Sequence, residues 1–159
     1  MIGPAGRVTG GAEAPPILLC ERRLTMSCKS ALYAAMQTPA AVAVGGVIPL
    51  GSLIRRYGCD VSLNGNSVNI TGAGYYDVDA SITVAPTAAG TVTVTLYKDG
   101  VAVPGATASA TATAADDVLD LSIPALVRQV CCAAGSALTL VLTGAAATVN
   151  NVALRVQRI

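Results

Sequence analysis

Apolar and polar side chains alternate without a break along residues 76–84. One set of alternate positions is apolar and the other is polar or acidic: Tyr76, Val78, Ala80, Ile82 and Val84 against Asp77, Asp79, Ser81 and Thr83. A period of two places successive side chains on opposite faces of a strand. This segment is therefore predicted to be a β-strand with one buried and one polar face.

The same pattern extends over most of the chain after residue 47. Residues 91–97 alternate threonine with Val92, Val94 and Leu96, and Asp99-Gly100 then supplies a tight hairpin turn into residues 101–103. Asn64-Gly65 is a second turn signal of this kind. Further strands are expected at residues 106–114, 119–123, 126–130, 137–143 and 148–158. The strand at 106–114 suits an edge or a subunit contact, and the strand at 119–123 is expected to stop at Pro124. Eight to ten short strands separated by turns are typical of a sandwich or barrel.

Residues 1–46 differ from the rest and are predicted to form an N-terminal arm, leaving residues 47–159 as the β-domain. The arm begins with a stretch rich in glycine and proline, which favours extended or turn backbone. A helix is expected from about Thr25 to Gln37, capped by Thr25 or Ser27 and stopped by Pro39. So short a helix is marginal alone in water and needs a surface to lie on.

The arm is the expected attachment site for a partner protein, through strand addition or a docked helix. Its candidate contact residues are apolar or basic: Ile17, Leu18, Leu19, Arg22, Arg23, Leu24, Met26, Leu32, Tyr33 and Met36.

Composition argues against an enzyme. The chain has no histidine, and histidine is the usual acid–base group near neutral pH and the commonest metal ligand. Ser–His and Cys–His nucleophile pairs and most zinc sites are therefore excluded, and we expect no cofactor and no metal. Tryptophan and phenylalanine are also absent, so a core built from small side chains needs many of them or an oligomeric interface.

Two groups of acidic residues are the remaining candidates for chemistry. Asp77 and Asp79 lie on one face of the predicted strand, about 7 Å apart by strand geometry, and could act as an acid–base pair or bind a cation. The simpler interpretation is a solvated polar face, which we favour. Asp116 and Asp117 fall in an expected loop with Asp120 just after it, but the three lack the spacing of a known calcium loop.

Charge is distributed unevenly along the chain. Residues 1–59 hold six basic and two acidic residues, a balance of +4, and residues 60–159 hold four basic and seven acidic residues, a balance of −3. Such a basic arm suits a negative partner surface, although ordinary solvated arginine explains it equally well. Arg55-Arg56 is too small a basic field to predict nucleic-acid binding, and a salt bridge to a neighbouring subunit is the better interpretation. No segment is long and apolar enough to span a membrane, and no secretory signal is evident, so synthesis in the host cytoplasm is expected.

The five cysteines are not spaced as a zinc site. They are Cys20, Cys28, Cys59, Cys131 and Cys132, and most are expected to pack as small apolar residues. A disulfide formed late between Cys59 and Cys131 or Cys132 is a remaining alternative. The reducing environment of a cytosol argues against it.

Several segments of the predicted β-domain resemble the jelly rolls of the C1q/TNF-like family. They are residues 64–70 (NGNSVNI), 72–78 (GAGYYDV), 92–105 (VTVTLYKDGVAVPG), 131–140 (CCAAGSALTL) and the final strand 152–159. The resemblance covers about residues 47–159 and implies an all-β jelly-roll sandwich. The chain departs from the family in having few core aromatic residues, so the family's ligand loops and calcium sites are not transferred.

The alanine- and threonine-rich sequence with its Cys-Cys pair is more specifically similar to jelly-roll proteins encoded in prophages, which serve as head fibres or capsid decoration proteins. This resemblance implies a homotrimer on the virion surface, bound to the major capsid protein or another virion protein. The alternative function is a carbohydrate- or cell-surface-binding adhesin, in which Tyr75 or Tyr97 would have to contact the glycan.

Overall fold

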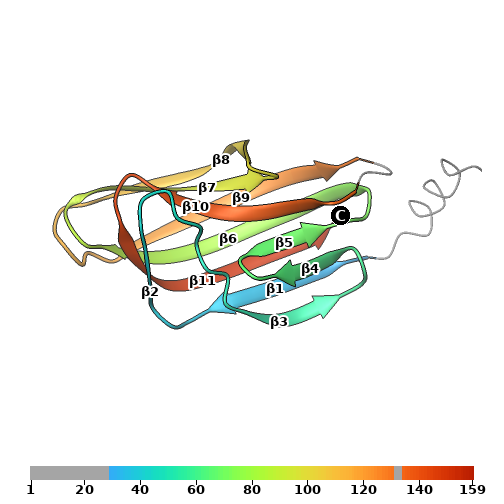
Figure 1. The fold of residues 1–159 in the computed structure, drawn as a ribbon, viewed down its shortest axis with the longest axis horizontal. Coiled ribbons are helices and arrows are strands. Elements are labelled where there is room, and N and C mark those ends of the chain that lie inside the picture. Colours follow the sequence, from blue (N-terminus) through green and yellow to red (C-terminus); the bar gives the residue numbers. More distant parts are fainter. Residues whose placement is uncertain (1–28, 131–133) are drawn as a thin grey trace, which may run out of the picture.

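The computed structural model describes residues 29–130 and 134–159, which form two antiparallel β-sheets packed face to face (Figure 1). Sheet A has the strand order β3-β1-β11-β6-β9, with the short β2 also paired to β11, and sheet B has the order β4-β5-β10-β7-β8. The strands are β1 (Ala31–Met36), β2 (Ala40–Val42), β3 (Ser52–Tyr57), β4 (Val61–Asn64), β5 (Ser67–Ile70), β6 (Gly74–Pro86), β7 (Gly90–Lys98), β8 (Val101–Ala112), β9 (Leu119–Gln129), β10 (Ser136–Thr143) and β11 (Ala147–Arg158). In this part of the chain no helix is long and apolar enough to cross a membrane.

The alternation along residues 76–84 is confirmed and places the core between the sheets. β6 buries Tyr76, Val78, Ala80, Ile82 and Val84 completely or nearly so. Facing strands contribute the same kind of side chain, so the core is almost wholly aliphatic: Leu32, Ile70, Val92, Val94, Leu96, Ile123, Leu138, Leu140, Leu142, Leu154 and Val156. Tyr76 is the one aromatic residue among the buried side chains of the described residues.

Both predicted hairpin turns are confirmed. Gly65 and Asn66, directly after Asn64, join β4 to β5, and Asp99 and Gly100 join β7 to β8, with a positive φ at both residues of the second turn. β8 lies at the edge of sheet B, as its alanine and threonine pattern predicted. On its exposed face three hydroxyl pairs bridge it to β7: Thr91 with Thr111, Thr93 with Ser109 and Thr95 with Thr107.

The helix predicted from about Thr25 to Gln37 is wrong in the part that the structure describes. Residues 31–36 form β1, which pairs with β11 on one side and β3 on the other. Leu32, Ala34 and Met36 point into the core, and the residues between them face outward, so the period is two. The paired positions of two neighbouring strands outweigh the helix preference of alanine.

The sandwich consequently begins before residue 47. Both β1 and β2 belong to sheet A, and the chain then crosses to sheet B, where Ile48 donates a main-chain hydrogen bond to Leu140 (2.8 Å). Residues 31–46, assigned to the arm from the sequence, are thus part of the folded domain. Residues 1–28 lie outside the described residues.

The strand predicted to stop at Pro124 instead continues through it. β9 runs from Leu119 to Gln129 and pairs with β6 along its whole length, with Pro124 opposite Asp79. Proline lacks an N–H and is tolerated in a strand whose outer side has no partner. β9 is the edge strand of sheet A, which explains the error.

The outward face of sheet A carries a row of very short side chains. The register aligns Ala35 of β1, Ala153 of β11, Ser81 of β6 and Ser122 of β9 across four neighbouring strands. None of the four belongs to the buried core, so together they form a flat strip of surface. Such a strip allows another polypeptide to approach the sheet closely.

We predict a large difference in stability between two glycine-to-alanine variants. Gly51 and Gly100 both have a positive φ, of 74° and 82°, but an added Cβ at Gly51 would lie 2.3 Å from the Ala35 carbonyl oxygen, whereas at Gly100 it meets nothing within 4 Å. G100A should therefore cost only the backbone strain of about 1–2 kcal/mol. G51A adds the displacement of β1 and should cost about 2–5 kcal/mol in total.

Urea denaturation of both variants measures these costs. Equal losses of unfolding free energy would contradict the close approach of Gly51 to β1.

Candidate functional site

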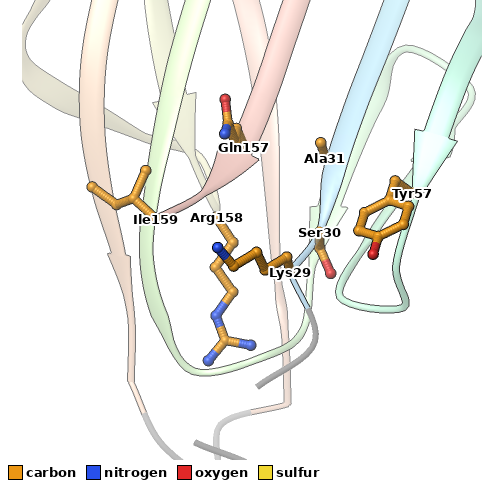
Figure 2. Close-up of a pocket in the computed structure, with 7 residues that line it drawn as sticks. All are labelled: Lys29, Ser30, Ala31, Tyr57, Gln157, Arg158 and Ile159. Atoms are coloured by element: carbon orange, nitrogen blue, oxygen red, sulfur yellow. The ribbon is translucent and has the colours of Figure 1, made fainter. Parts of the chain in front are cut away.

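The two ends of the described chain meet at one end of sheet A. Arg158, the last residue of β11, donates a main-chain hydrogen bond to the Ser30 carbonyl (2.8 Å), and Ile159 donates one to Tyr75 (3.0 Å). Figure 2 shows residues from the start of β1, the end of β3 and the end of β11 converging at this corner. The ends meet because β1 and β11 pair antiparallel, which places the start of β1 beside the end of β11.

A buried ion pair holds this corner together. The Arg158 guanidinium donates to the Asp60 carboxylate (Nη1–Oδ2 2.6 Å), and the two side chains are only 10% and 7% exposed. Arg158 also donates to the Ala73 carbonyl, and the Asp60 N–H donates to the Ser30 hydroxyl (3.1 Å). The side chains and main chains of Asp60 and Arg158 thus join four segments, around residues 30, 60, 73 and 158.

Tyr76 lies beside this pair and contributes a neutral hydrogen bond. Its hydroxyl donates to the Gly72 carbonyl (2.6 Å). Burial, with a smaller contribution from the nearby Asp60 carboxylate, raises the pKa of Tyr76 to about 12. The phenol therefore stays protonated at neutral pH and serves as a structural donor.

A small pocket of about 360 Å³ opens next to the ion pair (Figure 2). Seven residues line it: Lys29, Ser30, Ala31, Tyr57, Gln157, Arg158 and Ile159. Its possible nucleophiles are the Lys29 amine, the Tyr57 phenol and the Ser30 hydroxyl, which accepts the Asp60 N–H, and no carboxylate lines it. The pocket can offer positive charge and an aromatic ring, but no acid–base pair.

A larger groove of about 620 Å³ continues from this pocket along the outward side of β1 and β3. We call it the β3 groove and define it by its lining residues: Ala31, Leu32, Tyr33, Ile54, Arg55, Arg56, Tyr57 and Arg155. Ala31 and Tyr57 belong to both hollows. Three of the lining residues are arginines and none is acidic, so the groove combines apolar surface with positive charge.

Asp77 and Asp79 both face an arginine. Arg155 of β11 lies 3.4 Å from a carboxylate oxygen of each, and all three side chains are about half exposed. The guanidinium lies between the two carboxylates and offsets one of their two negative charges. This arrangement agrees with the solvated polar face that we favoured for the sequence.

Two of the acidic residues after β8 have structural partners, Asp117 within the turn and Asp120 on β9. Asp117 accepts hydrogen bonds from the main chain and hydroxyl of Thr113 and from the main chain of Ala114, which lower the pKa of its carboxyl. Asp120 accepts the Thr83 hydroxyl (2.9 Å). Among the described residues, no three potential metal ligands are grouped together.

The predicted arm residues divide into those on β1 and those outside the described residues. Leu32 and Met36 are core residues, 1% and 7% exposed, and cannot contact a partner. Tyr33 is 40% exposed and lines the β3 groove. The remaining seven lie outside the described residues: Ile17, Leu18, Leu19, Arg22, Arg23, Leu24 and Met26. The same holds for Cys131 and Cys132, the suggested disulfide partners of Cys59.

Sequence reasoning missed the Asp60–Arg158 pair and the β3 groove. The pair is separated by 98 positions, and no local pattern connects the two residues. The groove depends on β1 being a strand, since β3 pairs with nothing else in the described chain. The one available signal was Arg55-Arg56-Tyr57, which was interpreted as a subunit contact.

Comparison with solved structures identifies the fold. A crystal structure of murine APRIL at pH 5.0 superposes with a TM-score of 0.62 at 11% identity, covering 82% of this chain and 99% of that one. The globular domain of zebrafish complement 1qA gives 0.60 at 8% identity, covering 82% and 98%. The vertex protein P5 of PRD1, a phage, gives 0.56 at 14% identity, covering 82% and 96%. No family model matches the sequence, and no curated protein is similar to it. The chain therefore has the TNF/C1q jelly-roll fold, as the sequence resemblance implied.

We predict that the two ion-paired arginines of β11 differ sharply in their contribution to stability. R158M leaves the Asp60 carboxylate buried without its guanidinium and should cost about 3–5 kcal/mol. R155M is the matched control, because its ion pairs are half exposed and should contribute about 0–1 kcal/mol.

The measurement is the free energy of unfolding of each variant in urea. A loss below about 1 kcal/mol for R158M would show that the pair does not hold the corner.

Proposed function

We propose that this chain is a structural virion protein without enzymatic activity, a trimeric capsid decoration or head-fibre protein attached through residues 1–28. The observation that carries the proposal is the fold itself, a jelly roll shared with a phage vertex protein. The resemblance of the sequence to prophage head-fibre modules suggests the more specific role. This fold and the exposed surfaces of sheet A suit a protein that binds a partner or forms part of an assembly.

The outward face of sheet A supports self-association. The strip of Ala35, Ala153, Ser81 and Ser122 lets a second copy lie close to the sheet. Around it, Tyr33 and Leu126 are 40% and 57% exposed. In a monomer their apolar surface would stay in contact with water, which is unfavourable. Three copies arranged about an axis beside this face would bury both features.

The chemistry of the described surface supports a role other than catalysis. The chain has no histidine, and three of its seven aspartates form ion pairs: Asp60 with Arg158, and Asp77 and Asp79 with Arg155.

Glycan binding is the second candidate function, and one observation favours it. Tyr57 and Tyr75 are 67% and 49% exposed and present aromatic surface on which a sugar ring can stack. Tyr57 sits in the basic groove, so the ligand best suited to it would be an acidic glycan. Tyr97, the other tyrosine considered for this role, is only partly exposed.

We predict that a variant lacking residues 1–28 folds and self-associates like the full chain but no longer binds its particle. The deletion must stop at residue 28, because β1 begins at Ala31 and Ser30 is bonded to Arg158. Loss of several weak contacts, multiplied over three chains, should reduce binding by about a hundredfold or more.

Co-sedimentation with particles stripped of the protein measures this binding. Circular dichroism and molar mass provide the control that the truncated chain is intact. Undiminished co-sedimentation of an intact truncated oligomer would refute attachment through residues 1–28.

A further inference from the structure

We propose that β3 is a docking edge for an extended, acidic segment of a partner protein, which adds to sheet A as a further strand. β3 is the last strand on its side of the sheet, and its outer main-chain edge has no partner among the described residues (Figure 1). Unpaired N–H and C=O groups on such an edge form hydrogen bonds with an incoming strand. The inference rests on the proposed function only for the source of the segment, a protein of the particle.

The exposure of β3 sets it apart from the other edge strands. All six of its residues are exposed, including Leu53, Ile54 and Tyr57 at 42%, 53% and 67%. The other strands that pair on one side only, β2, β4, β8 and β9, each bury at least one side chain. Arginines alone would protect an edge from unwanted pairing, but three large apolar residues beside them give an incoming strand a surface to bury.

The charge of the β3 groove selects an acidic partner. Arg55 and Arg56 lie on the strand, Lys29 lies next to its end, and none of the three forms an ion pair within the described chain. Arg56 donates through Nε to the Val61 carbonyl (2.7 Å), which fixes its side chain without neutralising it. Carboxylates on an added strand would balance these charges.

Charge also excludes the two occupants that this chain could itself supply. Antiparallel pairing of two copies along the whole of β3 would place Arg56 of one copy diagonally beside Arg55 of the other on the same face, within reach of each other, and these like charges repel. Residues 1–28 contain only two glutamates, Glu13 and Glu21, eight positions apart, so no stretch of this segment as long as β3 offers the groove more than one carboxylate. A separate acidic protein segment remains.

The test uses the full chain and an end-capped octapeptide of alternating glutamate and valine, with a lysine–valine peptide as control. We expect saturable binding of the acidic peptide that protects the amides of β3 from hydrogen exchange. R55E should weaken binding of the acidic peptide at least about tenfold and strengthen binding of the lysine peptide. R128E on β9, the opposite edge of the same sheet, is the matched control and should change binding less than about twofold.

Three outcomes would overturn the proposal. The first is no protection of the β3 amides by the acidic peptide at any concentration. The second is equal binding of the two peptides, or an equal effect of R55E and R128E. The third is protection of the β3 amides in the full chain alone that disappears on deletion of residues 1–28, since the chain would then cover its own edge. None of these depends on particle attachment, so failure here and failure of the proposed function are distinguishable.

Discussion

The antiparallel pairing of β1 with β11 is the contact on which the rest of the structure depends. It places the first described strand in the interior of sheet A, between β3 and β11, and brings both ends of the described chain to one corner. Without β1, β3 would have no neighbour, the β3 groove would not exist, and Ser30 could not reach Arg158. The buried Asp60–Arg158 pair secures this pairing at the point where strand ends would otherwise fray.

The same arrangement divides the molecule into a closed interior and surfaces suited to assembly. Aliphatic side chains fill the space between the sheets, and the one buried aromatic ring of the described residues uses its hydroxyl in the corner. The outward side of sheet A, in contrast, combines a strip of short side chains with a basic, partly apolar edge. Binding at such surfaces is favourable because it covers apolar area and pairs charges. A chain without histidine can therefore act through binding.

Much of the fold could be predicted from the sequence because it is encoded locally. The alternation in β6 and the two glycine turns are properties of a few adjacent residues. The sequence did not predict β1 because Leu32 and Met36 are four residues apart, a spacing that fits both one face of a helix and one face of a strand. Only the strands that neighbour this segment decide between the two. The continuation of β9 through Pro124 and the Asp60–Arg158 pair depend likewise on which strands become neighbours, which residues far apart in the sequence determine.

We propose that this chain builds an assembly through its surfaces, beginning with copies of itself. The molar mass of the purified protein, measured by light scattering across a range of concentrations, tests it most directly. The account predicts a stable species of three chains of 15.8 kDa each. A monomer that persists at high concentration would contradict it.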